Sequence, residues 1–257
     1  MRSRIWVKVS SGNLTPLMRF FIPAAAFLIL VTSVDAKNFA GDMFNLGIWK
    51  LTIPMDDDGD GAADEVTMPL LRYFEDPEFF HLSETGDSVV FRARCGGATT
   101  KTSKYPRSEL RELNKDGETK ASWSTTSGVH NMTIEFAINK VPKKKQHVVA
   151  AQIHDEENDI LMVRLEGKKL FLERHEEEDF MLIEDYKLGT FVKLMIIADN
   201  GRIRAFIGGS QVMEWKVEAE GLYFKVGCYT QSNPEKGDKP DDYAETEFRS
   251  VYVMHKG

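Results

Sequence analysis

Residues 191–217 read FVKLMIIADNGRIRAFIGGSQVMEWKV, three short apolar runs separated by two glycine-containing turns. Within Phe191–Ala198 the apolar side chains recur at every second position, which is the period of a β-strand rather than that of a helix. Asn200-Gly201 follows, and both residues tolerate the positive φ angles that a two-residue hairpin turn requires. The stretch therefore predicts antiparallel strands joined by tight turns.

Similar short runs continue along most of the chain, and most of them are separated by Gly, Asn, Asp or Pro. They cover Ile48–Ile53, Ser88–Arg94, Val129–Ile138, His147–His154, Ile160–Leu165, Lys169–Arg174, Leu222–Gln231 and Thr246–Val253. Many short strands with almost no helix predict an all-β fold, either a sandwich or a jelly roll. Residues 37–257 contain no internal repeat, low-complexity linker or shift in composition, so we expect them to form a single domain.

Composition narrows the classes of partner and site. The 257 residues are 42% hydrophobic and 28% charged, the balance of a water-soluble globular protein. Lys and Arg number 33 against 40 Asp and Glu, and the resulting net charge of −7 argues against a nucleic-acid partner. Any polyanionic partner must therefore be bound by a local cluster of basic groups. Two cysteines exclude a four-cysteine metal site, and both a Cys95–Cys228 disulfide and two buried free thiols fit the sequence.

Residues 1–36 have the pattern of a secretory signal peptide. Basic residues precede the uncharged apolar run Phe20–Val31, and small and polar residues follow up to Ala36. The run is shorter than the roughly 20 residues of a membrane span, and a retained signal anchor is the alternative. We expect cleavage near Ala36 and a secreted, extracellular monomer that does not bind membranes after signal removal. Asn131-Met132-Thr133 is a glycosylation sequon at the start of an expected strand.

Three segments carry polar side chains where a strand of the core would not need them. In the first, Tyr105–Glu112, an extended chain places Arg107, Glu109 and Arg111 on one face. Two guanidinium groups ordered by a carboxylate are suited to recognising a carboxylate on a ligand. A solvated charged strand is the alternative interpretation of this segment.

The second and third segments are also expected strands. Val148–His154 ends with Gln152 and His154 on one face, a pair that is as readily structural as catalytic. In the third segment one face bears Tyr223, Lys225, Tyr229 and Gln231, with Gly227 between them. Gly inside a strand indicates that a ligand or another backbone approaches closely. We expect this face to form a floor on which a flat group such as a sugar ring lies.

In this order and spacing, the three segments resemble the signature motifs of alginate lyases of polysaccharide lyase family 7. The motifs are RSELR at 107–111, QIH at 152–154 and YFKVGCYTQ at 223–231, and NLGIWKLTIP at 45–54 is similar to the family's first strand. The resemblance extends from Asn45 to the C-terminus. Cys228 and Thr230 depart from the more frequent family residues, but Cys228 faces the expected core and Thr230 leaves the reactive face unchanged.

The resemblance implies a concanavalin-like β-jelly roll with a concave substrate groove. It also implies β-elimination at the 4-O-glycosidic bond of alginate, a polyuronate, which leaves an unsaturated uronate end. Because the C5 proton beside a carboxylate is very weakly acidic, the enzyme must mask that carboxylate and supply a base and an acid. By motif position, Arg107 and Gln152 neutralise the carboxylate, His154 is the base and Tyr229 is the acid. For one uronate epimer, Tyr229 performs both proton transfers.

The same comparison of motifs implies residues that bind or position the substrate: Glu109, Arg111, Tyr223, Lys225 and Gln231. The QIH form of the second motif resembles members that accept guluronate-containing blocks. Since alginate is a polyanion, we expect Arg107, Arg111 and Lys225, with Arg92 or Arg94, to face it and the acidic residues to lie elsewhere.

Two other functions compete with this interpretation. A jelly-roll glycoside hydrolase needs two carboxylates flanking the bond, and neither Glu157 with Asp159 nor Glu177 with Asp179 has a clean strand setting. A non-catalytic carbohydrate-binding module is the stronger alternative. It would bind sugar through aromatic side chains but would give no reason for an amide, an imidazole and a phenol to converge.

The turn Asp56–Gly61 begins like a calcium-binding loop, with acidic residues at Asp56, Asp58 and Asp60. The twelfth position is Thr67 instead of the bidentate glutamate of such a loop, so a structural calcium and a solvated acidic turn are both considered. No cofactor or metal is expected in the reaction, because elimination needs none when Arg107 masks the carboxylate.

Overall fold

The computed structural model describes residues 39–257, and the predicted signal peptide over residues 1–36 lies outside this range. Within residues 39–257 the helices are four short 3-10 turns: η1 Ala40–Asp42, η2 Leu46–Ile48, η3 Leu70–Tyr73 and η4 Pro234–Lys236. In this described part of the chain, no helix has the length and apolar character needed to cross a bilayer.

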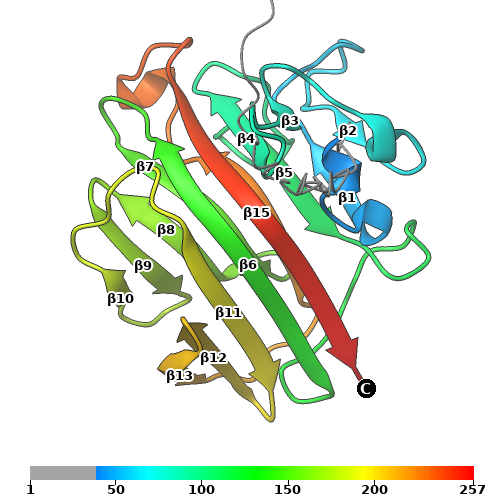
Figure 1. Cartoon of the computed structure of the whole chain (residues 1–257), viewed down its shortest axis with the longest axis vertical. Coiled ribbons are helices and arrows are strands. Elements are labelled where there is room, and N and C mark those ends of the chain that lie inside the picture. Colours follow the sequence, from blue (N-terminus) through cyan, green and yellow to red (C-terminus); the bar gives the residue numbers. More distant parts are fainter. Residues whose placement is uncertain (1–38) are drawn as a thin grey trace, which may run out of the picture. The chain divides into compact units, whose positions relative to one another are not determined.

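Fifteen strands form two sheets in which neighbouring strands are antiparallel (Figure 1). The eight-stranded sheet has the order β10-β9-β8-β7-β14-β5-β1-β2, and the seven-stranded sheet has the order β13-β12-β11-β6-β15-β4-β3. The strands are β1 Trp49–Thr52, β2 Glu65–Val66, β3 Phe80–Leu82, β4 Val89–Arg94, β5 Arg107–Glu112, β6 Val129–Lys140, β7 His147–His154, β8 Asp159–Glu166, β9 Lys169–Arg174, β10 Phe180–Ile183, β11 Val192–Asp199, β12 Arg202–Ile207, β13 Ser210–Lys216, β14 Tyr223–Thr230 and β15 Tyr243–Lys256.

The predicted all-β architecture is confirmed. The hairpin between β11 and β12 turns at Asn200 and Gly201, whose φ angles are 48° and 68°, and Asp199 pairs with Arg202 across it. The segment Tyr105–Glu112, for which an extended conformation was one interpretation, contains β5. Strands β2, β3 and β10 were not predicted, because runs of two to four residues are too short to establish a period.

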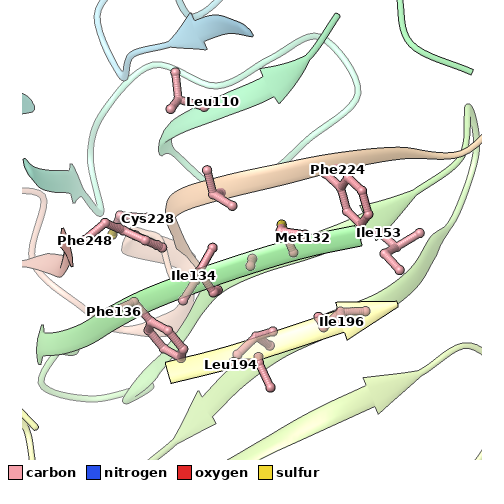
Figure 2. Packing of buried hydrophobic residues seen from close by; sticks show 14 of the residues in the cluster. Leu110, Met132, Ile134, Phe136, Ile153, Leu194, Ile196, Phe224, Cys228 and Phe248 are labelled. Atoms are coloured by element: carbon pink, nitrogen blue, oxygen red, sulfur yellow. The ribbon is translucent and has the colours of Figure 1, made fainter. Parts of the chain in front are cut away.

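Apolar side chains from both sheets form one core, part of which is shown in Figure 2. The eight-stranded sheet contributes Leu110, Ile153, Phe224 and Cys228, and the seven-stranded sheet contributes Met132, Ile134, Phe136, Leu194, Ile196 and Phe248. Each is at most 1% exposed, and full burial of a large apolar side chain contributes roughly 1.5–3 kcal/mol. Because successive strand residues point to opposite faces, burying this set turns the alternate polar residues of β5, β7 and β14 outward.

Two features that the sequence did not decide are settled by packing. Cys95 and Cys228 are buried free thiols and form no disulfide. Burial raises the pKa of Cys95 to about 11, so this thiol stays protonated at neutral pH. Asn131 lies inside β6, 9% exposed, and its side-chain oxygen accepts a hydrogen bond from the Thr133 hydroxyl at 3.0 Å. Such a buried position does not favour glycosylation.

Gly227 brings β14 close to β5. It lies opposite Glu109 and has a φ of 146°, a value that L-amino acids rarely adopt. A Cβ at this position would lie 2.8 Å from the Glu109 Cα and 3.1 Å from the Phe91 Cδ1, and closer still to the Ser108 carbonyl oxygen. The missing side chain therefore makes room for the neighbouring backbone and the core. Of the two causes expected for a glycine inside this strand, a ligand or another backbone, the structure shows the approach of another backbone at Gly227.

We expect Gly227→Ala to lower the free energy of unfolding by about 3 kcal/mol or more, since the new methyl group meets backbone that cannot retreat without breaking the β5–β14 ladder. Gly209→Ala is the matched control. Gly209 also has a positive φ, 87°, but nothing lies within 4 Å of its Cβ position, so its cost should be about 1 kcal/mol. Urea unfolding measures both variants, and equal losses would contradict the close approach of the two strands.

Candidate active site

The outward polar side chains of the eight-stranded sheet line a cavity of about 600 Å³. Three neighbouring strands, β7, β14 and β5, supply most of the predicted site residues. The cavity is lined by all four predicted catalytic residues and by three of the predicted substrate-binding residues: Arg107, Gln152, His154, Tyr229, Arg111, Tyr223 and Lys225. Residues that are far apart in the sequence therefore meet at one place.

Strand register accounts for this convergence. Strand β14 lies between β5 and β7, so its outward residues face residues of the first motif, the second motif or, for Lys225, both. The facing pairs are Lys225 with Arg111 and with Gln152, Tyr229 with Arg107, and Tyr223 with His154. A shift of one residue in either ladder would turn these side chains into the core.

Glu109 joins the three strands beneath the cavity. Its side chain is 2% exposed, and its Oε2 lies 2.7 Å from the Lys225 Nζ and 3.0 Å from an Arg107 Nη1. Its Oε1 accepts a hydrogen bond from the Gln152 amide nitrogen. Burial alone would raise the pKa of Glu109, but Lys225 and Arg107 together hold it below its usual value. Glu109 thus orders the groups that line the cavity without lining it itself.

Lys225 is a cation held in a dry environment. Burial lowers the pKa of its ammonium group to about 8, although the adjacent Glu109 carboxylate opposes the shift. Arg107 and Arg111 act in the same direction as burial because they carry like charge. Lys225 is therefore charged at neutral pH and loses its charge as the pH rises through about 8.

Each arginine covers the ring of a tyrosine on β14. The guanidinium carbon of Arg107 lies 3.8 Å from the Tyr229 ring centroid, and that of Arg111 lies 3.9 Å from the Tyr223 ring centroid. The Tyr229 hydroxyl also lies 3.1 Å from the Ser103 hydroxyl, on the loop before β5. These contacts fix both rings and place positive charge beside the phenol of Tyr229.

His154 closes one side of the cavity. Its Nε2 lies 3.2 Å from Asp159 Oδ1, and its Nδ1 faces the Asp155 carbonyl oxygen and lies 3.1 Å from the Tyr223 hydroxyl. The His154 and Tyr223 rings stack, with centroids 5.5 Å apart and planes 20° apart. The imidazole is therefore held in one orientation by three neighbours.

Two predicted placements are wrong. Gln231 follows the end of β14 and does not line the cavity. Because strand alternation stops at Thr230, the two-residue spacing that joined Gln231 to Tyr229 no longer fixes its direction. Arg92 and Arg94 lie on β4 of the other sheet, where they pair with Glu245 and Glu78, so neither faces this cavity.

Acidic residues line the cavity as well, contrary to the expectation that they would lie elsewhere. Three of them, Glu156, Glu157 and Asp159, form what we call the acidic rim beside His154. Glu65 lies on another side and pairs with Lys50 at 2.6 Å. The basic groups therefore form the floor of the cavity, and the acidic groups belong to its edge.

Several residues near the cavity were missed in the sequence. Lys50 and Thr52 of β1 line it. They alternate along the strand with the buried Trp49 and Leu51, and this alternation could have placed them on the outward face. Ser103 carries no comparable signal, because it lies on an irregular loop before β5.

The acidic turn differs from the expected calcium ligands. Carboxylate oxygens of Asp56, Asp58 and Asp64 lie within 4.8 Å of one another, whereas Asp60 pairs with Lys101 at 3.6 Å. Each of the three grouped carboxylates already accepts a backbone N–H within the turn. A calcium ion at this turn stays a prediction, with Asp64 in place of Asp60.

A larger cavity of about 910 Å³ lies at another place, around Trp123, His130 and His255. None of the predicted site residues lines it. Its polar groups serve packing: the buried Glu112 accepts hydrogen bonds from the Trp123 indole and the Phe224 amide and contacts His255. We therefore assign the chemistry to the smaller cavity.

Comparison with known proteins bears on the site. The sequence model of the alginate lyase family matches residues 44–255. The structure of alginate lyase AlgAT5 from polysaccharide lyase family 7 is 46% identical, with a TM-score of 0.82 over 86% of this chain and 100% of that chain. The alginate lyase from Corynebacterium sp. is 34% identical, with a TM-score of 0.80 over 86% of this chain and 100% of that one.

A curated relative, an alginate lyase from Klebsiella pneumoniae, is 41% identical over 98 residues. The match covers 37% of this chain and 32% of the relative, so the chain spans about a third of the length of that protein.

The ion cluster around Glu109 gives a prediction that does not depend on the reaction. Replacing Glu109 with Gln leaves Lys225 and Arg107 without a counter-charge, so the pKa of Lys225 should fall below about 8. The fold should also lose about 3–5 kcal/mol of stability. NMR titration with ¹³C-labelled lysine measures the pKa, and Glu65→Gln, which removes only the exposed partner of Lys50, is the control. A Lys225 that titrates near the ordinary value of 10.5 in the unmodified protein would contradict this account.

Proposed function

The chain belongs to the alginate lyase family, polysaccharide lyase family 7, and we propose that it cleaves alginate by β-elimination at the 4-O-glycosidic bond. The observation that carries this proposal is the convergence of a guanidinium, an amide, an imidazole and a phenol around one cavity. They are Arg107, Gln152, His154 and Tyr229, and they come from three different strands.

The first requirement of the reaction is to mask the uronate carboxylate. Arg107 supplies the charge, because Glu109 neutralises only one of the two buried cations beside it and leaves the cluster with a net positive charge. Gln152 directs one amide hydrogen to Glu109, which leaves its second amide hydrogen for the substrate. Masking the carboxylate makes the C5 proton more acidic, since the developing negative charge then forms beside cations.

Proton transfer follows from the positions of His154 and Tyr229. His154 takes the C5 proton, the C5–H electron pair forms the C4=C5 double bond, and the C4–O4 pair leaves with the oxygen. Tyr229 gives its phenolic proton to that oxygen, and Arg107 above the ring stabilises the phenolate that remains. When the proton and the leaving oxygen lie on one face of the sugar, Tyr229 serves both steps.

Binding of the polyanion is local and electrostatic. Lys50, Arg111 and Lys225 line the cavity with Arg107 and form a local basic cluster in a chain whose net charge is −7. Such contacts weaken as salt screens them. Arg111 and Tyr223, which are stacked on each other, present a flat surface of the kind that sugar rings bind.

The alternatives are less well supported by these contacts. A non-catalytic binding module has no use for a buried amide and a fixed imidazole beside a phenol. A glycoside hydrolase needs a carboxylate pair across the bond, whereas Glu157 and Asp159 both belong to the acidic rim on one side of the cavity, and Asp159 pairs with His154.

The finer properties are proposals as well. A preference for guluronate-containing blocks is supported by the QIH form of the second motif. Secretion is supported by the basic and apolar pattern of residues 1–36, and we propose that the exported protein acts as a monomer. The elimination draws on no cofactor, because Arg107 and Gln152 supply the masking that a metal ion would otherwise provide. Calcium at Asp56, Asp58 and Asp64 would have a structural role.

We expect His154→Ala to reduce kcat on guluronate blocks by about 100-fold or more, because general base catalysis contributes roughly 10²–10⁴-fold. Tyr229→Phe should abolish measurable activity on both block types, since every proposed route uses its proton. The ultraviolet absorbance of the new unsaturated uronate reports the reaction. Purified protein that binds alginate but forms no such product would support the binding-module alternative.

A further inference from the structure

His154 contacts one carboxylate, that of Asp159, which has no role in the proposed reaction as described above. Asp159 Oδ1 lies 3.2 Å from the Nε2 of His154. Asp159 is the first residue of β8 and pairs directly with His154 at the end of β7, where the register of the two strands shifts. The pairing of β7 with β8 therefore fixes the position of this carboxylate, which does not depend on an irregular loop.

The partners of His154 constrain its protons. The Asp155 carbonyl oxygen and the Asp159 carboxylate can only accept hydrogen bonds, so the arrangement is satisfied in full when both ring nitrogens carry hydrogen. The hydrogen bond from His154 lowers the pKa of Asp159, so the carboxylate is ionised at neutral pH. In this state the imidazole is an ion-pair partner and not yet a base.

One of the two contacts can yield to a substrate. Asp155 engages Nδ1 through its backbone, which the chain fixes, whereas the Asp159 side chain is 45% exposed at the edge of the cavity. Nε2 is therefore the nitrogen that can exchange its partner for the C5–H group of a bound uronate.

We propose that Asp159 is a positioning residue that acts through His154. It holds the imidazole in place before the substrate binds. When the substrate displaces Asp159 from Nε2, the Nε2 proton leaves to solvent and gives the base form, and Asp159 pairs again with the imidazolium after the C5 proton has moved to Nε2. The proton then leaves to water, which returns His154 to its base form. This role rests on the proposed elimination reaction and adds a fifth group to it.

The stereochemistry of the two uronates makes the role selective. Mannuronate and guluronate differ at C5, so the C5 proton and the leaving oxygen lie on the same face in mannuronate and on opposite faces in guluronate. Two groups on opposite sides of the ring are needed in the second case, and one group can serve in the first. Asp159 should therefore matter for guluronate blocks and much less for mannuronate blocks.

The test is Asp159→Asn, assayed on polyguluronate and polymannuronate through the absorbance of the unsaturated product. We expect kcat on polyguluronate to fall about tenfold, part of the full contribution of a general base, and kcat on polymannuronate to change less than about twofold. The acidic limb of kcat/KM on polyguluronate should move to lower pH, because the imidazolium has lost its counter-charge. Asp159→Glu should restore part of the loss.

Other charges near His154 must be held constant in this comparison. The titratable and charged groups around His154 and its partner are Asp155, Asp159, Tyr223, Arg107 and Lys225. Glu157→Gln is the matched control, because Glu157 belongs to the same acidic rim and has no contact with His154 among those that the structure describes. Both variants remove one negative charge from the path of a polyanion, so they share any decrease in KM.

The outcomes separate this inference from the proposed function. Wild-type protein that forms no unsaturated product from either polymer would overturn the proposed function itself. If the wild type is active, the role of Asp159 alone would be overturned by an Asp159→Asn variant that behaved like Glu157→Gln or lost activity equally on both polymers. If the enzyme acts on guluronate blocks only, the role of Asp159 is tested by the pH shift of Asp159→Asn and by its loss of kcat relative to Glu157→Gln. An unchanged melting temperature for Asp159→Asn shows that the effect is not a loss of folding.

Discussion

A buried carboxylate between two buried cations is the interaction on which this site depends. Glu109 lies under the cavity, and its Oε2 contacts both Lys225 at 2.7 Å and Arg107 at 3.0 Å. A buried charge without a partner costs several kcal/mol, so neither cation could stay buried without the Glu109 carboxylate. Because one anion serves two cations, the cluster keeps a net positive charge. In the proposed reaction the uronate carboxylate supplies the missing counter-charge, so that binding and masking of the carboxylate become one event.

At the level of this cluster the fold leaves no room for a side chain on β14 beside β5. Gly227 allows β14 to lie against β5 at the level of Glu109, where a Cβ would meet Ser108 and Phe91. The apolar faces of the same strands are fixed by the core between the sheets (Figure 2). Since each strand alternates its side chains, the packing of the core and the order of the polar residues in the cavity are two results of one register.

Charge is distributed across the cavity in a way that suits the chemistry of a polyanion. Basic groups form the floor beneath the sugar, whereas Glu156, Glu157 and Asp159 lie at the edge beside His154. A uniformly positive cleft would bind the polymer more strongly but would leave the imidazole without a carboxylate beside it. The acidic edge supplies that carboxylate through the contact between Asp159 and His154. The basic floor gives a chain with net charge −7 a local anion-binding surface.

The sequence by itself determined most of the strands and the outward faces of the three motifs, because two-residue alternation and hairpin turns are local properties. It therefore predicted that Arg107, Glu109 and Arg111 share a face, and that Gln152 and His154 do so. It could not determine which strands are neighbours, since pairing depends on burying the whole core. Only the tertiary structure decided that Glu109 lies beneath the cavity, that Gln231 and Arg92 lie outside it, and that Asp159 reaches His154. Each of these depends on the register between strands that are distant in sequence, and that register is a property of the assembled sheets.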